Sequence, residues 1–505
     1  MPFPRHEEGV SPRDSDLRRS WREWIAALGP GAIVASLTIG TGELIFSSRA
    51  GALFGYRTLG LFALVLGLKW VLVFSSARYW VYSDVHPLRR WAELPGPRGW
   101  LPLTLLLLAV PAFPVWVSFH SGTLGTLVGV LTGTRDALGG NATLVWGAVL
   151  LGVTWVLSVT GGYHRQERFQ TWVVALMLIA VVVALFVMGP DWGAMLGGLF
   201  RIGGVEYPDW ARELPEFRNR PVWVEVATYA GVVGGSGYDY LAYVAWLRDK
   251  HGSRAERRIS PEALSRFVAA DATVSFLAVL VFSGVFVACG AMLLGPRHQV
   301  PAGTDLLTLQ AQFVAAVGAW LIPLYFAGAF LALAGTLYGT IEVAPAILRE
   351  MLGALLPDGA VPDDRRIRRW GVGWTACGAF AILLGTLLWR TSVGTKEPIN
   401  LVAWVTPANL FTGVLACGWI SALNVWTDRR YATGGARMGW TLTVLNGVGA
   451  VLFFFIGLKG VWDQGRWVGV AMVLGSLAAG CGIAAVFGRR RRYDRAKAGT
   501  SEESA

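Results

Sequence analysis

The chain alternates between long apolar stretches and short polar segments. A helix that spans a membrane needs about 20 consecutive, mostly apolar residues, and about twelve such stretches occur along the sequence. The pattern lacks the period-two alternation of membrane-spanning strands, so it predicts an all-α integral membrane protein. The expected helices cover residues 24–54, 57–83, 100–131, 142–160, 170–189, 222–247, 264–294, 311–341, 370–389, 398–425, 440–458 and 467–487.

The composition supports this fold class. Of the 505 residues, 54% are hydrophobic and only 15% are charged, whereas a soluble chain carries about 25% charged residues. These values exclude a disordered protein, a fibrous protein and an ordinary soluble enzyme. The four cysteines form no CxxC pair, which argues against a disulfide framework and a thiolate metal site. We expect no resident cofactor.

The basic residues indicate an orientation in the membrane. The net charge is +11, but Lys and Arg gather at the two ends and in every second loop, which is the pattern of cytoplasmic segments. We therefore expect a protein of the cell (inner or plasma) membrane with both termini in the cytoplasm. The basic clusters suit lipid headgroups better than nucleic acid. The pattern does not indicate an oligomeric state.

Two of the expected helices are interrupted by glycine clusters beside a carboxylate. One lies within 24–54 and the other within 222–247. Each glycine destabilises a helix interior by about 1 kcal/mol, so we expect unwound segments, and unwound backbone at membrane depth must be buried in protein or line a cavity. The residues that we assign to substrate binding here are Gly40, Thr41, Gly42 and Glu43 in the first cluster and Gly235, Ser236, Gly237 and Asp239 in the second.

The spacing of the two interruptions predicts an inverted repeat. They lie five helices apart, so the second crosses the membrane in the opposite direction, and interrupted helices at matching positions of two halves indicate the binding site of a transporter. We divide the chain into a cytoplasmic tail (1–23), the first repeat through helix six (24–247), the rest of the second repeat (248–425), two additional helices (426–488) and a basic cytoplasmic tail (489–505).

Several motifs resemble the Nramp family of divalent-metal transporters. Gly29-Pro30-Gly31, followed by Gly40-Thr41-Gly42-Glu43 and by the run RAGALFGY at 49–56, is similar to the family's first helix. Gly162-Tyr163 with Glu167 resembles the start of its fifth helix, and AGTLYG at 334–339 resembles its eighth. The resemblance covers about residues 24–425 and implies the leucine-transporter fold, with a five-plus-five inverted repeat.

The same comparison shows two departures. The family's first helix carries Asp-Pro-Gly-Asn, whose Asp and Asn bind the metal, but this chain has Gly40-Thr41-Gly42-Glu43 at that offset. The family's sixth helix carries Met-Pro-His, whose sulfur selects soft metals, but this chain has Gly234-Gly235-Ser236-Gly237. The chain therefore resembles a divergent branch without the soft-metal site.

The carboxylates are the strongest candidates for chemistry. A carboxylate at membrane depth is costly and is a functional-site hypothesis by default, so we assign Glu43 and Asp239 as metal ligands. With Thr41, Ser236 and freed carbonyls they form an all-oxygen set, which suits Mg²⁺, Mn²⁺ or Ca²⁺. Glu43 is also a candidate for the coupling proton. The structural alternatives are a pairing of Glu43 with Arg49 or a backbone N–H, and helix capping by Asp239.

Three further polar residues lie inside expected helices. Thr336 and Asn409 are candidates for substrate binding, with hydrogen bonding between helices as the alternative. His120 is a second candidate for proton coupling because a histidine titrates near neutral pH, and the alternative is a satisfied packing residue.

The sequence therefore predicts a secondary active transporter of a hard divalent cation such as Mg²⁺ or Mn²⁺ that works by alternating access around two unwound helices. It contains no nucleotide-binding or hydrolytic motif, so we expect neither a pump driven by ATP nor an enzyme. Two alternatives stay open. One is an ion-coupled transporter of an organic cation or amino acid on the same fold, and the other is a membrane scaffold or sensor that does not transport.

Overall fold

A computed structural model of the protein describes residues 30–160, 172, 183, 185–253, 259–301, 308–315, 318–357, 359–397 and 399–502. Every regular element in these ranges is a helix, so the prediction of an all-α protein is confirmed. Eight stretches are long and apolar enough to cross a membrane, and two of them, Pro30–Ser83 and Gly434–Phe487, have 54 residues each. The count of twelve and the inverted repeat stay predictions, because most of 170–189 lies outside the described residues.

The first expected helix is continuous in the structure. It consists of α3 (Pro30–Thr38), the π-helix η2 (Ile39–Ser47) and α4 (Ser48–Phe54). Gly55 has a φ of 60° and a ψ of −143°, a conformation that glycine adopts at little cost and other residues avoid. It ends the helix, and the short η3 (Gly55–Thr58) leads into α5 (Leu59–Ser83).

The sixth expected helix is broken where its glycines lie. α13 (Val222–Val232) and α14 (Gly237–His251) are separated by residues 233–236. Gly234 and Gly235 have φ angles of 82° and 97°, which a residue with a Cβ rarely adopts. α14 then begins with a capping box formed by Ser236 and Asp239. Here the glycine cluster does unwind the helix, as predicted.

The other helices follow the predicted order with shifted ends. The largest shift concerns the helix expected at 311–341, which begins and ends later in the structure, as α17 (Ile322–Leu355). It extends beyond the apolar stretch since its charged residues Glu342 and Glu350 are paired with arginines. The remaining elements are α6 (Pro87–Trp91), α7 (Trp100–Leu131), α8 (Thr134–Leu138), α9 (Asn141–Thr160), α11 (Trp192–Leu199), α12 (Asp209–Glu213), α15 (Pro261–Cys289), η4 (Gly290–Leu294), η5 (Gly295–Arg297), α16 (Thr308–Ala315), η6 (Ala319–Leu321), α18 (Asp364–Val393), α19 (Leu401–Asn409), η7 (Leu410–Leu415), α20 (Ala416–Tyr431), η8 (Gly434–Ala436) and α21 (Trp440–Glu502).

α21 comprises two helices that meet at a kink. Arg466 has φ 49° and ψ −132°, which is not helical. The kink lies between the two ranges, 440–458 and 467–487, that the sequence predicts as separate helices. The apolar pattern therefore located both of them, although no loop separates them.

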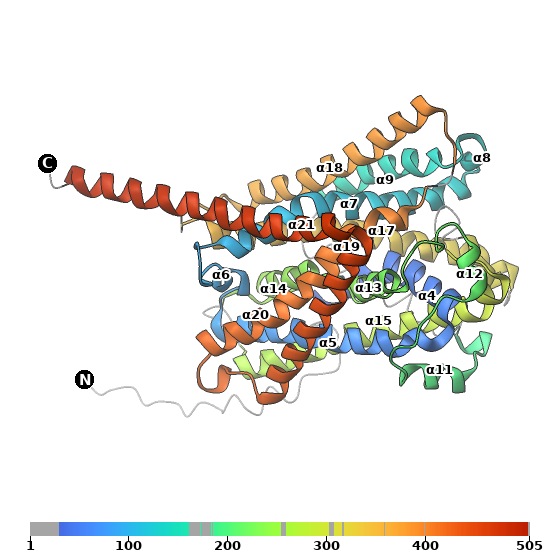
Figure 1. The fold of residues 1–505 in the computed structure, drawn as a ribbon, viewed down its shortest axis with the longest axis horizontal. Helices are drawn as coiled ribbons and strands as arrows, with labels where there is room; N and C mark the ends of the chain where they lie inside the picture. Colours follow the sequence, from blue (N-terminus) through green and yellow to red (C-terminus); the bar gives the residue numbers. More distant parts are fainter. Residues whose placement is uncertain are drawn as a thin grey trace, which may run out of the picture.

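The helices are arranged around the first and sixth predicted spans. α3 and η2 pack against α15 and α17, while α7, α9 and α18 pack against one another along one side of the molecule (Figure 1). α6 and the C-terminal end of α21 lie at one end of the bundle, and α11 and α12 lie at the other (Figure 1). The sequence assigns these two pairs to opposite sides of the membrane, and they do lie at opposite ends.

Candidate functional site

A small cavity lies beside the break between α13 and α14. Its volume is about 40 Å³, and a buried water needs about 10–15 Å³ by this measure, so there is room for a small ion with a few water molecules. Seven helical segments (α3, η2, α7, α13, α14, α17 and η7) and the break contribute to its walls. The lining residues are Leu37, Thr38, Thr41, Gly42, Phe113, Trp116, His120, Gly231, Val232, Gly235, Ser236, Tyr238, Asp239, Thr340 and Thr412.

The glycine cluster of the first helix is wound, contrary to the sequence-based expectation of an unwound segment. Gly40 to Glu43 lie in the π-helix η2 and are all buried. A Cβ on Gly40 would lie 2.1 Å from Thr336 Oγ1 and 2.7 Å from the Ala332 carbonyl oxygen. Gly40 therefore allows α17 to pack closely, and its role is packing. A π-helical turn still perturbs the regular hydrogen-bond ladder, and such turns often occur at functional sites.

The helix-six break is stabilised by a lysine from another helix. Lys69 of α5 is fully buried, and its Nζ donates to the carbonyl oxygens of Gly231 (2.9 Å), Val233 (2.7 Å) and Gly235 (2.7 Å). Lys69 was not among the residues predicted for the site. The signal was present, because a lysine in the middle of the apolar stretch 57–83 needs a partner at membrane depth.

The other two carbonyls of the break also have donors. The Val232 carbonyl accepts from the Gly235 N–H at 3.0 Å, and the Gly234 carbonyl accepts from the Tyr240 hydroxyl at 2.6 Å. Every carbonyl from 231 to 235 is thus hydrogen-bonded. In this conformation the protein's own donors bind these carbonyls, so the expectation that freed carbonyls serve as metal ligands stays a prediction.

Asp239 combines the two roles that the sequence analysis weighed as alternatives. Its Oδ2 accepts from the Ser236 N–H at 2.6 Å, and its own N–H donates to Ser236 Oγ at 3.3 Å, so it caps α14. It also lines the cavity and is the one acidic residue among the lining residues. The start of α14 places partial positive charge beside this carboxylate.

Glu43 points elsewhere. It does not line the cavity, and its Oε2 accepts hydrogen bonds from Ser47 and from Ser283 of α15 (2.6 Å for Ser283). Its Oε1 is buried and has no hydrogen-bond partner. The prediction that Glu43 and Asp239 form one metal site is therefore not supported by the geometry. The described residues contain no group of three His, Cys, Asp or Glu that could hold a metal ion.

His120 lies in the cavity wall. Its Nδ1 is 2.9 Å from Thr41 Oγ1, and its ring stacks on Trp116 with centroids 5.5 Å apart. It is the one histidine among the lining residues. The structure therefore places this proton-coupling candidate next to the expected substrate position.

Hydroxyl oxygens complete the polar wall. The hydroxyls of Thr38, Thr340 and Thr412 donate to carbonyls of their own helices at 2.8–2.9 Å. A hydroxyl that donates in this way keeps lone pairs that can accept or coordinate. These three threonines were not predicted, because threonine in an apolar helix is common and carries little signal by itself.

The remaining predicted residues do not reach the cavity. Thr336 Oγ1 donates to the Ser36 carbonyl at 2.9 Å, and Asn409 Nδ2 donates to the Thr228 carbonyl at 2.9 Å. A Cβ on Gly237 would lie 2.8 Å from Ala416 Cβ. These residues hold helices together, which for Thr336 and Asn409 is the alternative that the sequence left open. Of the predicted residues, those that line the cavity are Thr41, Gly42, Gly235, Ser236, Asp239 and His120. Those that do not line it are Gly40, Glu43, Gly237, Thr336 and Asn409.

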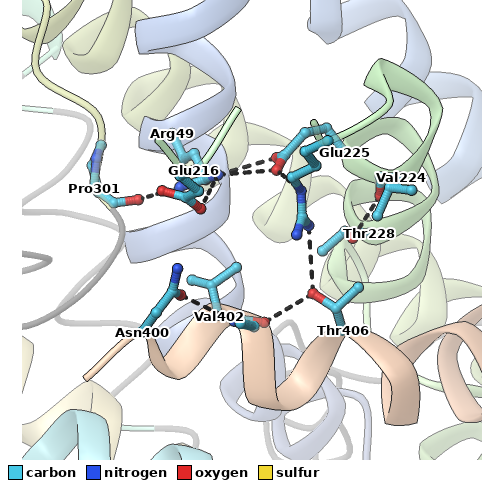
Figure 2. Close-up of polar contacts among 11 residues, drawn as sticks. Arg49, Glu216, Val224, Glu225, Thr228, Pro301, Asn400, Val402 and Thr406 are labelled. Atoms are coloured by element: carbon cyan, nitrogen blue, oxygen red, sulfur yellow. Dashed lines mark hydrogen bonds and ion pairs between the residues drawn. The ribbon is translucent and has the colours of Figure 1, made fainter. Parts of the chain in front are cut away.

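A buried ion-pair cluster lies at one end of the broken helix (Figure 2). Arg49 of α4 is fully buried and forms two bonds to Glu225 of α13, at 3.1 and 3.0 Å. It also contacts Glu216 at 2.6 Å and the Pro301 carbonyl at 2.8 Å. Arg220 pairs with Glu225 at 2.6 Å. We call Arg49, Glu216, Arg220 and Glu225 the Arg49 cluster. The suggested pairing of Glu43 with Arg49 is wrong, since other acids take that arginine.

A second cluster lies at the other end of the broken helix. Glu350 of α17 is fully buried and pairs with Arg248 of α14 at 2.5 Å, Arg349 at 3.5 Å and Arg89 of α6 at 3.8 Å. We call these four residues the Glu350 cluster. Glu225 lies near the start of α13 and Arg248 near the end of α14, so the break and its cavity lie between the two clusters along the helix.

Comparison with known proteins agrees with this architecture. Residues 31–463 match the sequence model of the family "Natural resistance-associated macrophage protein-like" (Nramp). No curated protein matches the chain. Among solved structures, a manganese transporter from Eremococcus coleocola is similar. A variant with a histidine replaced by alanine has 14% identity and a TM-score of 0.68 over 94% of this chain and 96% of that chain. A complex with an aromatic bis-isothiourea compound has 13% identity and a TM-score of 0.66 over 93% and 96%. At such identities the likeness shows the fold alone.

Proposed function

This chain belongs to the Nramp family, and on that premise we propose that it is a secondary active transporter of a hard divalent cation, Mg²⁺ or Mn²⁺. Nramp proteins are integral membrane transporters of divalent metals, and the similar solved structures are those of a manganese transporter. The family supplies the class of substrate. The choice of a hard cation depends on the residues of this chain.

One observation carries the proposal, namely that the Asp239 carboxylate lies in the wall of a small cavity at the helix-six break. The polar groups around it are hydroxyls of threonine and serine and the imidazole of His120. Oxygen ligands suit Mg²⁺ and Mn²⁺, and Mg²⁺ keeps several of its waters when it binds to one or two carboxylates. A cavity of about 40 Å³ leaves room for such waters.

The lining residues also argue against a preference for soft metals. Neither a cysteine nor a methionine occurs among them, and thioether or thiolate ligands are what favours softer ions. His120 supplies a single imidazole, and its Nδ1 is already engaged with Thr41.

The two ion-pair clusters suit alternating access. The Arg49 cluster links α4, α13 and the segment before α13, and the Glu350 cluster links α6, α14 and α17. By the predicted orientation, the first faces outward and the second faces the cytoplasm. Opening the cavity to one side requires breaking one cluster while the other holds.

Calorimetric titration of the purified protein with Mg²⁺, Mn²⁺, Ca²⁺ and Cd²⁺ tests the proposal. We expect saturable binding of Mg²⁺ or Mn²⁺ that Asp239→Asn weakens at least tenfold, because the variant removes the one carboxylate of the cavity. Thr336→Ser is the matched control, since Thr336 lies outside the cavity and serine keeps its hydroxyl. A folded protein that takes up no divalent ion would contradict the proposal.

An organic cation is the second candidate, and the aromatic wall is the observation that favours it. Phe113, Trp116 and Tyr238 line the cavity together with Asp239, and aromatic faces beside a carboxylate attract organic ammonium groups. The small volume argues against this candidate. Uptake of a radiolabelled amine into proteoliposomes that divalent ions do not inhibit would favour it. If neither class of substrate is bound or transported, a scaffold or sensor role is the remaining interpretation.

A further inference from the structure

The ammonium of Lys69 is held by backbone carbonyls at the break of the sixth helix. Its three N–H groups donate hydrogen bonds to the carbonyl oxygens of Gly231, Val233 and Gly235, with N–O distances of 2.7–2.9 Å. These distances are typical of charge-assisted hydrogen bonds. No donor is left over, and the side chain has no exposed surface.

The backbone of the break is shaped to present these carbonyls. Gly234 and Gly235 have positive φ angles, and α13 has just ended. The C-terminal end of a helix carries partial negative charge from its unpaired carbonyls. In broken helices of transporters, such carbonyls coordinate ions. In potassium channels, rings of carbonyls replace the hydration shell of a monovalent cation.

Carboxylates are not the direct partners of this ammonium. In the part of the chain that the structure describes, no acidic side chain forms an ion pair with Lys69, and Asp239 and Glu43 act on it only at longer range. The Tyr240 hydroxyl shares the Gly235 carbonyl at 3.3 Å. Backbone dipoles therefore provide the first layer of compensation for the positive charge.

We propose that the carbonyls of Gly231, Val233 and Gly235 form a backbone site for a monovalent cation of the size of ammonium or potassium, and that Lys69 fills it with a tethered ammonium. This site borders the cavity that we assign to the transported ion, because Gly231 and Gly235 line that cavity whereas Lys69 and Val233 do not. The protein then needs no dissociable monovalent cation to hold the break open. Removing the amine turns the position into a binding site for a free cation.

The experiment compares Lys69→Ala and Lys69→Met with the wild-type protein in detergent. Thermal unfolding is measured at constant ionic strength in chlorides of N-methylglucamine, sodium, potassium and ammonium. Alanine leaves room for a free cation, whereas methionine keeps most of the side-chain volume without the charge. Lys459→Ala is the matched control because Lys459 forms an exposed pair with Asp463.

We expect Lys69→Ala to melt well below the wild type in N-methylglucamine chloride and to recover at least half of the loss, saturably, in ammonium or potassium chloride. Lys69→Met should be destabilised without recovery, and the wild type and Lys459→Ala should show no saturable response. The proposal is overturned if both Lys69 variants melt like the wild type, or if no monovalent cation stabilises Lys69→Ala more than the wild type. If Lys69→Ala requires ammonium or potassium to remain folded during purification, that supports the proposal, and failure to fold in every salt counts against it.

Discussion

The Arg49 guanidinium and the Glu225 carboxylate form a buried, two-bond ion pair between α4 and α13, with Nε–Oε2 and Nη2–Oε1 distances of 3.1 and 3.0 Å (Figure 2). Neither side chain has exposed surface. The pair joins the end of the first helix to the start of the broken sixth helix. The first and sixth helices, which both contribute residues to the cavity wall, are thereby fixed to each other on the side that we predict to face outward.

Replacing one member of this pair should destabilise the protein strongly. Removing one partner of a buried pair leaves an uncompensated charge and costs about 3–5 kcal/mol, so Glu225→Gln should lower the free energy of unfolding by an amount of that order. Arg49→Lys keeps the charge but loses the two-bond geometry and should cost less. Denaturant unfolding of both variants and of the double variant gives the coupling energy, and independent effects that simply add would contradict the pairing.

Gly40 should be far more sensitive to alanine than Gly42. The added Cβ at Gly40 would meet Thr336 Oγ1 at 2.1 Å and the Ala332 carbonyl oxygen at 2.7 Å, and backbone cannot move aside cheaply. At Gly42 the nearest atom is a Val232 methyl at 3.3 Å. Overpacking typically costs about 1–3 kcal/mol. We expect a lower melting temperature for Gly40→Ala and a near wild-type value for Gly42→Ala, which serves as its matched control. Equal effects would show that the helices can separate at Gly40.

The sequence predicted the helices better than the site. Apolar length and glycine content suffice to locate helices, even the two that meet at Arg466 without a loop, because both depend on local composition. The break at Gly234 and Gly235 was also predictable, since two adjacent glycines favour a conformation that other residues avoid. Helix ends were less predictable where, as at Glu350, arginines from other helices stabilise a charged residue inside the bundle.

The direction of each side chain could not be predicted in the same way. Glu43 and Asp239 each follow a glycine cluster in the sequence, yet only Asp239 lines the cavity. The difference arises because the first cluster is wound as a π-helix and turns Glu43 toward Ser283, whereas the second is unwound. Lys69 was missed for a related reason, because its partners are backbone atoms of a helix more than 160 positions away.

His86 should make stability depend on pH in the acidic range. It lies between α5 and α6, is buried, and accepts from the Leu88 N–H through Nδ1, which requires the neutral ring. Burial lowers its pKa to about 4, with Glu350 acting in the opposite direction and Arg248 and Arg349 reinforcing the shift. The unfolded chain takes up a proton near pH 6.5 and the folded chain only near pH 4. The folded state therefore loses stability as the pH falls through this window.

The slope of that loss can be measured. One proton that is bound by the unfolded state and not by the folded state changes the free energy of unfolding by at most about 1.4 kcal/mol per pH unit. His86→Asn keeps a side-chain acceptor for the Leu88 N–H but does not titrate. We expect a flatter stability profile for this variant between pH 6.5 and 4, and parallel profiles above pH 7. Identical slopes for the two proteins throughout would assign the acid sensitivity to other groups.

Glu43 should affect proton coupling rather than metal affinity. Its carboxylate lies outside the cavity, bound to Ser47 and Ser283, with Oε1 buried and without a hydrogen bond. An isolated carboxylate in such surroundings is suited to gain and lose a proton during the transport cycle.

We expect the dissociation constant of Glu43→Gln for Mg²⁺ or Mn²⁺ to lie within about threefold of the wild-type value. This is a small change in binding free energy, because a tenfold change corresponds to about 1.4 kcal/mol. In proteoliposomes with an internal pH dye, the metal-driven acidification should be abolished. Asp239→Asn should give the opposite result in the binding assay. If Glu43→Gln abolishes metal binding, the carboxylate reaches the ion in a conformation other than this one, and the assignment of Asp239 as the sole acidic ligand is wrong.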